Sequence, residues 1–62
     1  MHESKYILYG CQLIGNAHYI MYFDDLQSLY KEAKVRLQSG YSAVMKNNMT
    51  YEQLSIGLGD FD

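Results

Sequence analysis

The chain has 62 residues, a formal net charge of −2, no proline, no tryptophan and a single cysteine, Cys11. A length near the lower limit for a stable hydrophobic core leaves room for one domain, residues 1–62, and the lone cysteine excludes an intramolecular disulfide. The acidic balance gives no long-range attraction for phosphate backbones or anionic membranes, and a hydrophobic content of 48% excludes a disordered tail.

The N-terminal residues do not resemble a targeting segment. Residues 1–5 carry neither a basic region followed by an apolar core nor a lipidation motif. The apolar runs are all shorter than the roughly 18 residues that a membrane span needs. A single thiol is typical of reducing compartments, so we expect a cytoplasmic protein without a membrane partner.

Two runs near the N-terminus, residues 5–14 and 17–23, are rich in β-branched and aromatic residues and are separated by Gly15-Asn16. This dipeptide suits the two-residue turns of β-hairpins. A turn at that point predicts the register, which pairs Leu13 with His18, Cys11 with Ile20, Tyr9 with Tyr22, and Leu8 with Phe23.

Both faces of the predicted hairpin are mainly apolar. Side chains alternate along each strand, so one face carries Ile7, Tyr9, Cys11, Leu13, His18, Ile20 and Tyr22. The other face carries Tyr6, Leu8, Gln12, Ile14, Tyr19, Met21 and Phe23. A sheet with one wet side alternates apolar and polar residues, so each of these faces needs a cover.

A helix over residues 25–39 follows the hairpin. Asp24 and Asp25 suit its N-cap, with Gln27 in the capping-box position after Asp24, and Gly40 is placed to end it. Its apolar stripe consists of Leu26, Leu29, Tyr30, Ala33 and Leu37, and Glu32 and Arg36 form an i,i+4 pair. This helix covers one face of the hairpin.

Residues 41–46 predict a third strand, which a helical crossover places antiparallel to the first. The expected fold is therefore an α+β domain of ββαβ type, with an antiparallel sheet of order 2-1-3 and the helix packed on one face. Two interpretations of the C-terminal segment, residues 50–58, remain open. A capping box at residues 50–53 favours a short helix, whereas a turn at Asn47-Asn48 followed by the alternation of Leu54, Ile56 and Leu58 favours a fourth strand. We prefer the helix.

The sequence contains no recognisable catalytic, metal or cofactor motif. Cys11 and His18 are diagonal neighbours in the predicted register, about 7 to 8 Å apart between Cα atoms, which is too far for a nucleophile and its base. The histidines, cysteine and acids lack the paired spacing of a zinc site, and the glycines form no phosphate-binding loop. We therefore expect neither an enzyme nor a cofactor, and no small-molecule substrate is evident.

The seven tyrosines are the most unusual feature of the composition. Tyrosine provides a large rigid contact area with a hydroxyl that tolerates a wet edge, as binding surfaces require. We expect a small protein-binding module that uses one apolar, tyrosine-rich sheet face to bind a second copy, as a homodimer, or another protein. The residues expected at that contact are Tyr9, Cys11, His18, Ile20 and Tyr22.

Two alternative functions and one extension accompany this expectation. Tyrosines on a sheet also stack single-stranded nucleic acid, but the scattered and outnumbered basic residues disfavour that reading. A thiol-dependent enzyme that uses Cys11 and His18 is disfavoured further. By size and style alone, the chain resembles phage or mobile-element proteins that inhibit host proteins.

Overall fold

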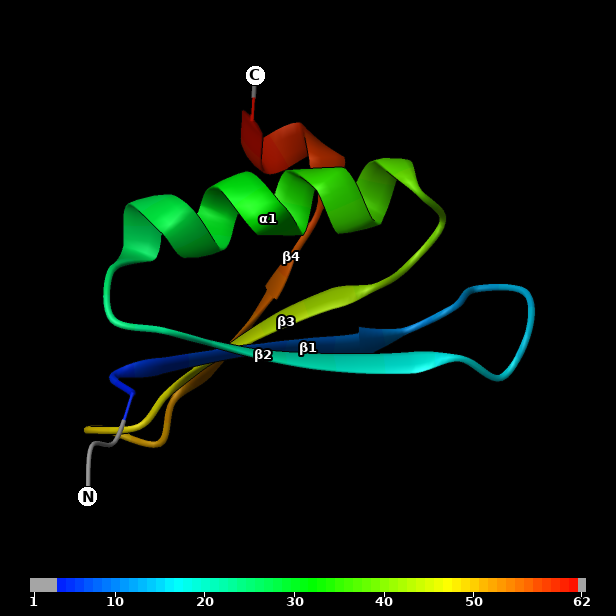
Figure 1. Cartoon of the computed structure of the whole chain (residues 1–62). Coiled ribbons are helices and arrows are strands. Elements are labelled where there is room, and N and C mark those ends of the chain that lie inside the picture. The colour runs from blue at the N-terminus through cyan, green and yellow to red at the C-terminus, as the bar shows by residue number, and fades with distance from the viewer. Residues whose placement is uncertain (1–3, 62) are drawn as a thin grey trace.

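The computed structural model describes residues 4–61, which form a four-stranded antiparallel sheet with one helix packed on it (Figure 1). The sheet order is β2-β1-β3-β4, so the predicted order 2-1-3 is confirmed and a fourth strand extends it. The elements are β1 (Tyr6–Cys11), β2 (His18–Phe23), α1 (Leu26–Gln38), β3 (Ala43–Asn47), β4 (Gln53–Ile56) and the short 3-10 helix η1 (Leu58–Phe61).

The register of the first hairpin differs from the predicted one by two residues. Tyr9 pairs with Ile20, and Cys11 pairs directly with His18 instead of lying diagonal to it. The turn is longer than Gly15-Asn16, because the N–H of Gln12 donates to the carbonyl of Ala17 and leaves four residues between them. A shift of two residues preserves the side of every side chain, so the predicted division of β1 and β2 into two faces is correct.

Helix α1 begins and ends at residues that the sequence singles out. The N-cap is Asp25 and not Asp24: the Asp25 carboxylate accepts from the N–H of Ser28 at 2.8 Å and from its hydroxyl at 3.1 Å. Gly40 follows the helix with φ of +86°, the left-handed conformation that terminates helices. The predicted pair of Glu32 and Arg36 is present, with Nε to Oε2 at 3.1 Å.

The core lies between α1 and one face of the sheet. Leu8 of β1 and Leu29 and Ala33 of α1 are fully buried, and Ala43 and Ile56 are nearly so. We call this side of the sheet the covered face. Strand pairing and alternation assign it Tyr6, Leu8, Gly10, Tyr19, Met21, Phe23, Ala43, Met45, Leu54 and Ile56.

The preferred short helix at residues 50–58 is wrong, and the alternative fourth strand is present. The Asn47 side chain accepts from the N–H groups of Met49 and Thr50, and the Thr50 hydroxyl accepts from the N–H of Glu52. These bonds form a turn that returns the chain along β3, where pairing with Ala43 buries Ile56. The gain from burying Ile56 outweighs a capping box that would open a helix containing Gly57.

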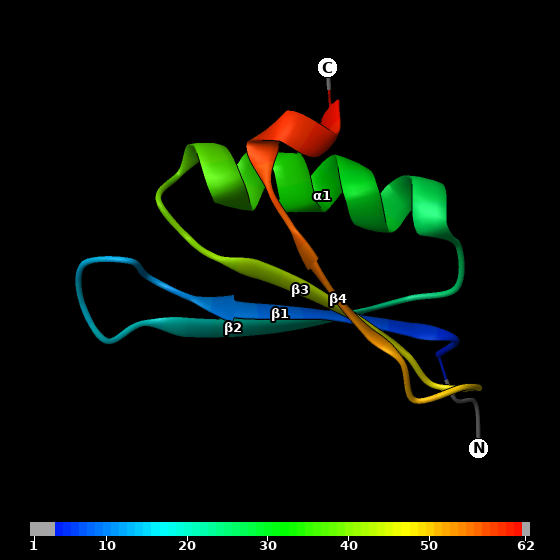
Figure 2. The same cartoon turned by 180° about the vertical axis from the view of Figure 1, so that it is seen from behind.

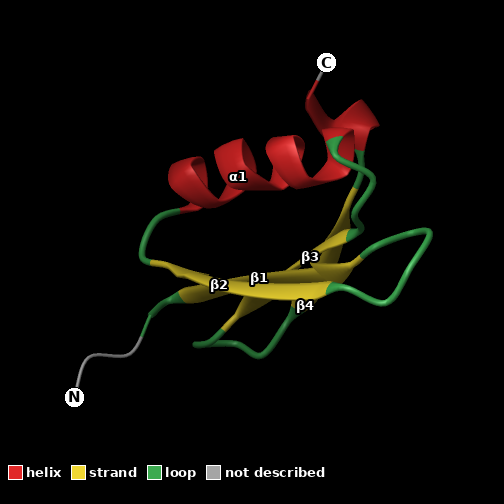
Figure 3. Ribbon diagram, turned by 45° about the vertical axis from the view of Figure 1, so that its right-hand side comes forward, coloured by secondary structure: helices red, strands yellow, loops and turns green. Residues whose placement is uncertain are grey.

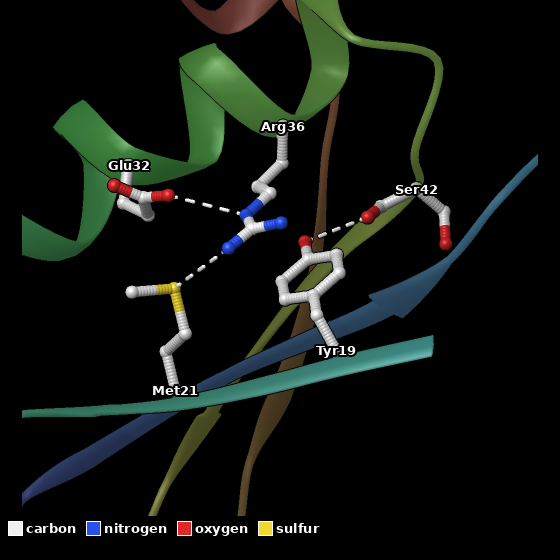
Figure 4. A network of polar contacts seen from close by, with 5 residues as sticks. All are labelled: Tyr19, Met21, Glu32, Arg36 and Ser42. Atoms are coloured by element: carbon white, nitrogen blue, oxygen red, sulfur yellow. Dashed lines mark hydrogen bonds and ion pairs between the residues drawn. The ribbon is translucent and has the colours of Figure 1, made fainter. Parts of the chain in front are cut away.

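A polar network joins the covered face to α1 (Figure 4). The guanidinium of Arg36 lies over the Tyr19 ring at 4.6 Å, contacts Met21 Sδ at 3.6 Å and pairs with Glu32. The Tyr19 hydroxyl donates to the carbonyl of Ser42 at 2.7 Å. Burial raises the pKa of the Tyr19 phenol, with a smaller opposing effect of the Arg36 charge.

Candidate functional site

In the part of the chain that the structure describes, residues 4–61, no helix lies on the second side of the sheet, which we call the open face. Its apolar and aromatic side chains are Ile7, Tyr9, Cys11, Ile20, Tyr22 and Val44, and its polar ones are His18, Lys46, Gln53 and Ser55. Ile20 is 56% exposed and Tyr22 is 59% exposed. Exposed apolar side chains grouped on one face are typical of an interaction surface.

The C-terminal segment does not cover the open face within residues 4–61. Strand β4 adds to the edge of the sheet beside β3, and η1 then lies against α1 on the covered side (Figures 1 and 2). The rings of Tyr30 and Phe61 meet edge to face at 6.1 Å between centroids. The described tail is therefore used on the helix side and leaves the open face free.

The five residues expected at a partner contact all lie on the open face. Tyr9 and Cys11 of β1 stand opposite Ile20 and His18 of β2, and Tyr22 lies two residues further along β2. Cys11 and His18 are therefore direct neighbours in the ladder. The Cys11 thiol nevertheless lies 3.9 Å from the Ser42 hydroxyl, which is its hydrogen-bond partner in the described structure.

Tyr9 lies on the inner strand β1 of the open face, and Ile20 lies opposite it on the edge strand β2. A shallow hollow of about 330 Å³ lies on the His18 side of this pair, and another of about 270 Å³ lies on the Lys46 side. The Tyr9 hydroxyl donates to the side-chain carbonyl of Gln53 at 2.9 Å, which links β1 to β4 across β3. The two hollows can receive projecting side chains of a partner, and the aromatic and aliphatic side chains between them provide apolar contact area.

Sequence reasoning missed the part of the open face that β3 and β4 contribute. Val44, Lys46, Gln53 and Ser55 join the face only because β3 pairs with β1 and β4 pairs with β3. The alternation of residues 54–58 was the available signal for β4, but it did not identify which side chains face outward. The face is therefore wider and more polar at its β4 edge than the hairpin alone predicts.

Tyr51 was also missed. It is 73% exposed and has φ of +65°, a left-handed conformation that is unfavourable for a tyrosine. Its N–H donates to the Asn47 carbonyl at 2.7 Å, and the Lys46 ammonium lies 5.8 Å from its ring centroid. The strained turn thus brings an aromatic ring beside the lysine of the open face.

The hairpin loop presents two further exposed aliphatic residues. Leu13 and Ile14 were predicted on opposite strand faces, but the longer turn places both in the loop, where Ile14 is 93% exposed. The Leu13 N–H donates to the Gly40 carbonyl at 2.9 Å and ties this loop to the end of α1. The loop projects past the end of the sheet (Figure 3).

The helix side of the described structure also has a hollow, which is larger than either hollow of the open face. A groove of about 380 Å³ between α1 and η1 is lined by Gln27, Ser28, Tyr30, Lys31, Lys34 and Phe61, which are exposed or half-buried. Within residues 4–61, no three of the His, Cys, Asp and Glu side chains are grouped to hold a metal ion. In the same residues, no helix is long and apolar enough to cross a membrane.

The chain was compared with protein-family models, with curated proteins and with solved structures, and no match was found in any of the three.

Proposed function

We propose that this protein is a non-enzymatic binding module that recognises another protein through the open face of its sheet. The observation that carries the proposal is the exposure of Ile20 and Tyr22 on a face that neither α1 nor the described tail covers. Complete burial of an exposed apolar side chain contributes about 1.5–3 kcal/mol to the stability of a complex. A protein of this size gains from a partner that removes such surface from water.

The electrostatics of the open face favour a protein partner. Lys46, on the inner strand β3, is the only lysine or arginine within the four strands, so the open face carries little charge. Interface centres are depleted in charge and enriched in tyrosine, with polar groups at the rim. Tyr9 on the inner strand β1, with the polar His18 and Gln53 on the edge strands β2 and β4, follows that arrangement.

The test is capture of binding proteins from a lysate of cells that express the chain. Ile20→Thr combined with Tyr22→Thr removes the two most exposed apolar groups of the open-face strands and keeps β-branched residues in β2. The matched control is Leu58→Thr, because Leu58 is 48% exposed but belongs to η1 on the helix side. We expect a captured protein that the double variant loses and the control retains.

Two results would count against a binding role of the open face. One is capture of the same proteins, in the same amounts, by the wild type and the double variant. The other is the absence of any specifically captured protein. Circular dichroism and thermal unfolding of the double variant show whether it is folded, so that loss of capture is not mistaken for loss of structure.

Single-stranded nucleic acid is the second candidate ligand, because Tyr9, Tyr22 and Tyr51 lie on or beside the open face and Lys46 is next to them. Stacking on aromatic rings contributes about 1–3 kcal/mol per base, but such sites also need a positively charged groove. Lys31 and Lys34 lie on α1, away from this face. An oligonucleotide titration at low salt tests the candidate: binding that weakens steeply with added salt would favour it over a protein ligand.

The remaining expectations stay predictions. A thiol enzyme using Cys11 and His18 predicts selective alkylation of the native thiol, and an unreactive thiol would exclude it. An inhibitor of a host protein is a narrower form of the binding module. Identification of the captured protein tests it.

A further inference from the structure

We propose that strand β2 pairs with β2 of a second copy, so that two chains form one continuous sheet. The inference goes beyond the proposed function, which concerns the open face, because it concerns the edge of the sheet and names the occupant. Within residues 4–61, β2 pairs with β1 on one side and lies at the edge of the sheet on its other side. Such an edge presents a row of unpaired main-chain donors and acceptors.

The residues that present these groups follow from the hydrogen-bond pattern. Main-chain groups of an antiparallel strand point alternately towards and away from its neighbour. The N–H of Gln12 donates to the carbonyl of Ala17, so the main-chain groups of Ala17 and of every second residue after it point towards β1. The main-chain groups of His18, Ile20 and Tyr22 therefore face outward along the edge.

The edge of β2 lacks the features that protect sheet edges. Natural edges carry charged residues, proline or bulges, or are very short. Strand β2 has six residues, His18–Phe23, with no lysine, arginine, acid or proline, and it pairs with β1 without interruption. The opposite edge is better protected, because β4 has four residues and its outward side chains on the open face are the polar Gln53 and Ser55.

A second copy fits this edge because the strand is complementary to itself. An antiparallel pair with Ile20 opposite Ile20 of the second copy places His18 opposite Tyr22 of that copy. All outward main-chain groups are then satisfied, and no like charges meet because the strand carries none. Any extended strand matches the main-chain spacing, but a two-fold axis also fixes which side chains meet, and it places only uncharged residues of this strand opposite one another.

The pairing also uses apolar surface beside the edge. The side chains of Ile20 and Tyr22 point to the open face, so a two-fold axis through Ile20 brings the two open faces side by side. On the other side of the sheet, α1 lies near β2 through the Arg36 contacts with Tyr19 and Met21. Val35, which is 51% exposed, lies on the same flank of α1 as Glu32 and provides apolar surface beside this edge on the helix side.

The test uses a synthetic chain in which Ile20 is replaced by N-methylisoleucine. This change keeps the open-face side chain and removes only an outward N–H, so it leaves the ladder with β1 intact. Sedimentation velocity over a dilution series should show a dimer for the unmodified chain. The modified chain should have a dissociation constant raised roughly 30-fold or more, because two symmetry-related hydrogen bonds are lost.

Amide hydrogen exchange of the unmodified chain provides a second measurement that does not depend on folding of the modified one. The amides of His18, Ile20 and Tyr22 should exchange more slowly as the concentration rises. A chain that is monomeric at every concentration would overturn the inference. So would a dimer whose β2 amides exchange at the same rate at all concentrations, because its contact would lie elsewhere.

The two proposals fail separately. A monomeric wild type that still captures a protein through Ile20 and Tyr22 retains the proposed function and removes the edge pairing. A dimer with protected β2 amides that captures nothing retains the edge pairing and removes the proposed function.

Discussion

Gly10 provides the sharpest test of how the sheet is held together. A Cβ atom at Gly10 would lie 2.7 Å from the carbonyl carbon of Ser42 and closer still to its oxygen. The same oxygen accepts the hydrogen bond of the Tyr19 hydroxyl, whose residue pairs with Gly10 across β1 and β2. Gly10→Ala therefore has to displace the Ser42 carbonyl, and this movement disrupts the bond from Tyr19.

The expected loss of stability follows from three contributions. Overpacking costs about 1–3 kcal/mol, and loss of the Tyr19 hydrogen bond costs about 1 kcal/mol. Lower entropy of the unfolded chain returns about 0.4–1 kcal/mol when alanine replaces glycine. The net loss of about 1–3.5 kcal/mol is a substantial part of the roughly 3–9 kcal/mol expected for a chain of this length. It corresponds to a decrease in melting temperature of roughly 5–25 °C.

Urea and thermal unfolding of Gly10→Ala, Tyr19→Phe and the double variant measure these contributions. Because both changes act on the Ser42 carbonyl, Tyr19→Phe should cost about 1 kcal/mol alone and much less in the presence of alanine. Gly57→Ala is the control, since a Cβ there has no neighbour within 4 Å. Wild-type stability of Gly10→Ala, or strictly additive losses, would refute the proposed crowding at Ser42.

Variants at Tyr51, Asp25 and Tyr19 test other parts of the account. Tyr51→Asn relieves the left-handed strain of about 1–2 kcal/mol while losing a ring contact with Lys46 of about 0.5–1 kcal/mol. We expect unchanged or higher stability in urea unfolding but weaker partner binding. Tyr51→Phe keeps both the ring and the strain, so it should bind the partner as the wild type does. Asp25→Ala removes the helix cap that accepts two hydrogen bonds from Ser28 and should lower the stability by about 1 kcal/mol. Asp25→Asn should restore most of this loss, and equal stability of both variants would contradict the capping role of Asp25. Because the pKa of the Tyr19 phenol is raised in the folded chain, the unfolded chain loses the phenol proton first as the pH rises. The contribution of the protonated phenol to stability is therefore present below about pH 10 and is lost as the pH rises further. Tyr19→Phe should make the alkaline loss of stability shallower, and an unchanged slope of stability against pH would argue against burial of the phenol.

Local patterns were sufficient to predict α1 and the division of the hairpin into two faces. The spacing of Leu29 and Ala33 identified the buried stripe, and Gly40 identified the end of the helix. The register of the hairpin was missed because the turn has four residues and not two, and one of them, Leu13, bonds to the distant Gly40 carbonyl. The side of each strand residue depends only on the parity of the register, which the two-residue error preserves.

The C-terminal strand and the edge of the open face required information that local patterns do not contain. A capping box at Thr50 is a local signal, whereas the burial of Ile56 against Ala43 depends on where β3 lies in the sheet. The same holds for Val44 and Lys46, whose side chains join Tyr9 only through strand pairing. Sequence reasoning therefore identified the part of the candidate site on β1 and β2 but not the part on β3 and β4.

Methyl NMR spectra of the chain, with and without the captured partner, test the central claim most directly. If the open face is the binding surface, the methyl signals of Ile7, Ile20 and Val44 should shift or broaden, while those of the buried Ile56 and Leu29 remain unchanged. Shifts confined to α1 or to the hairpin loop, with unaltered signals from Ile7, Ile20 and Val44, would contradict the account.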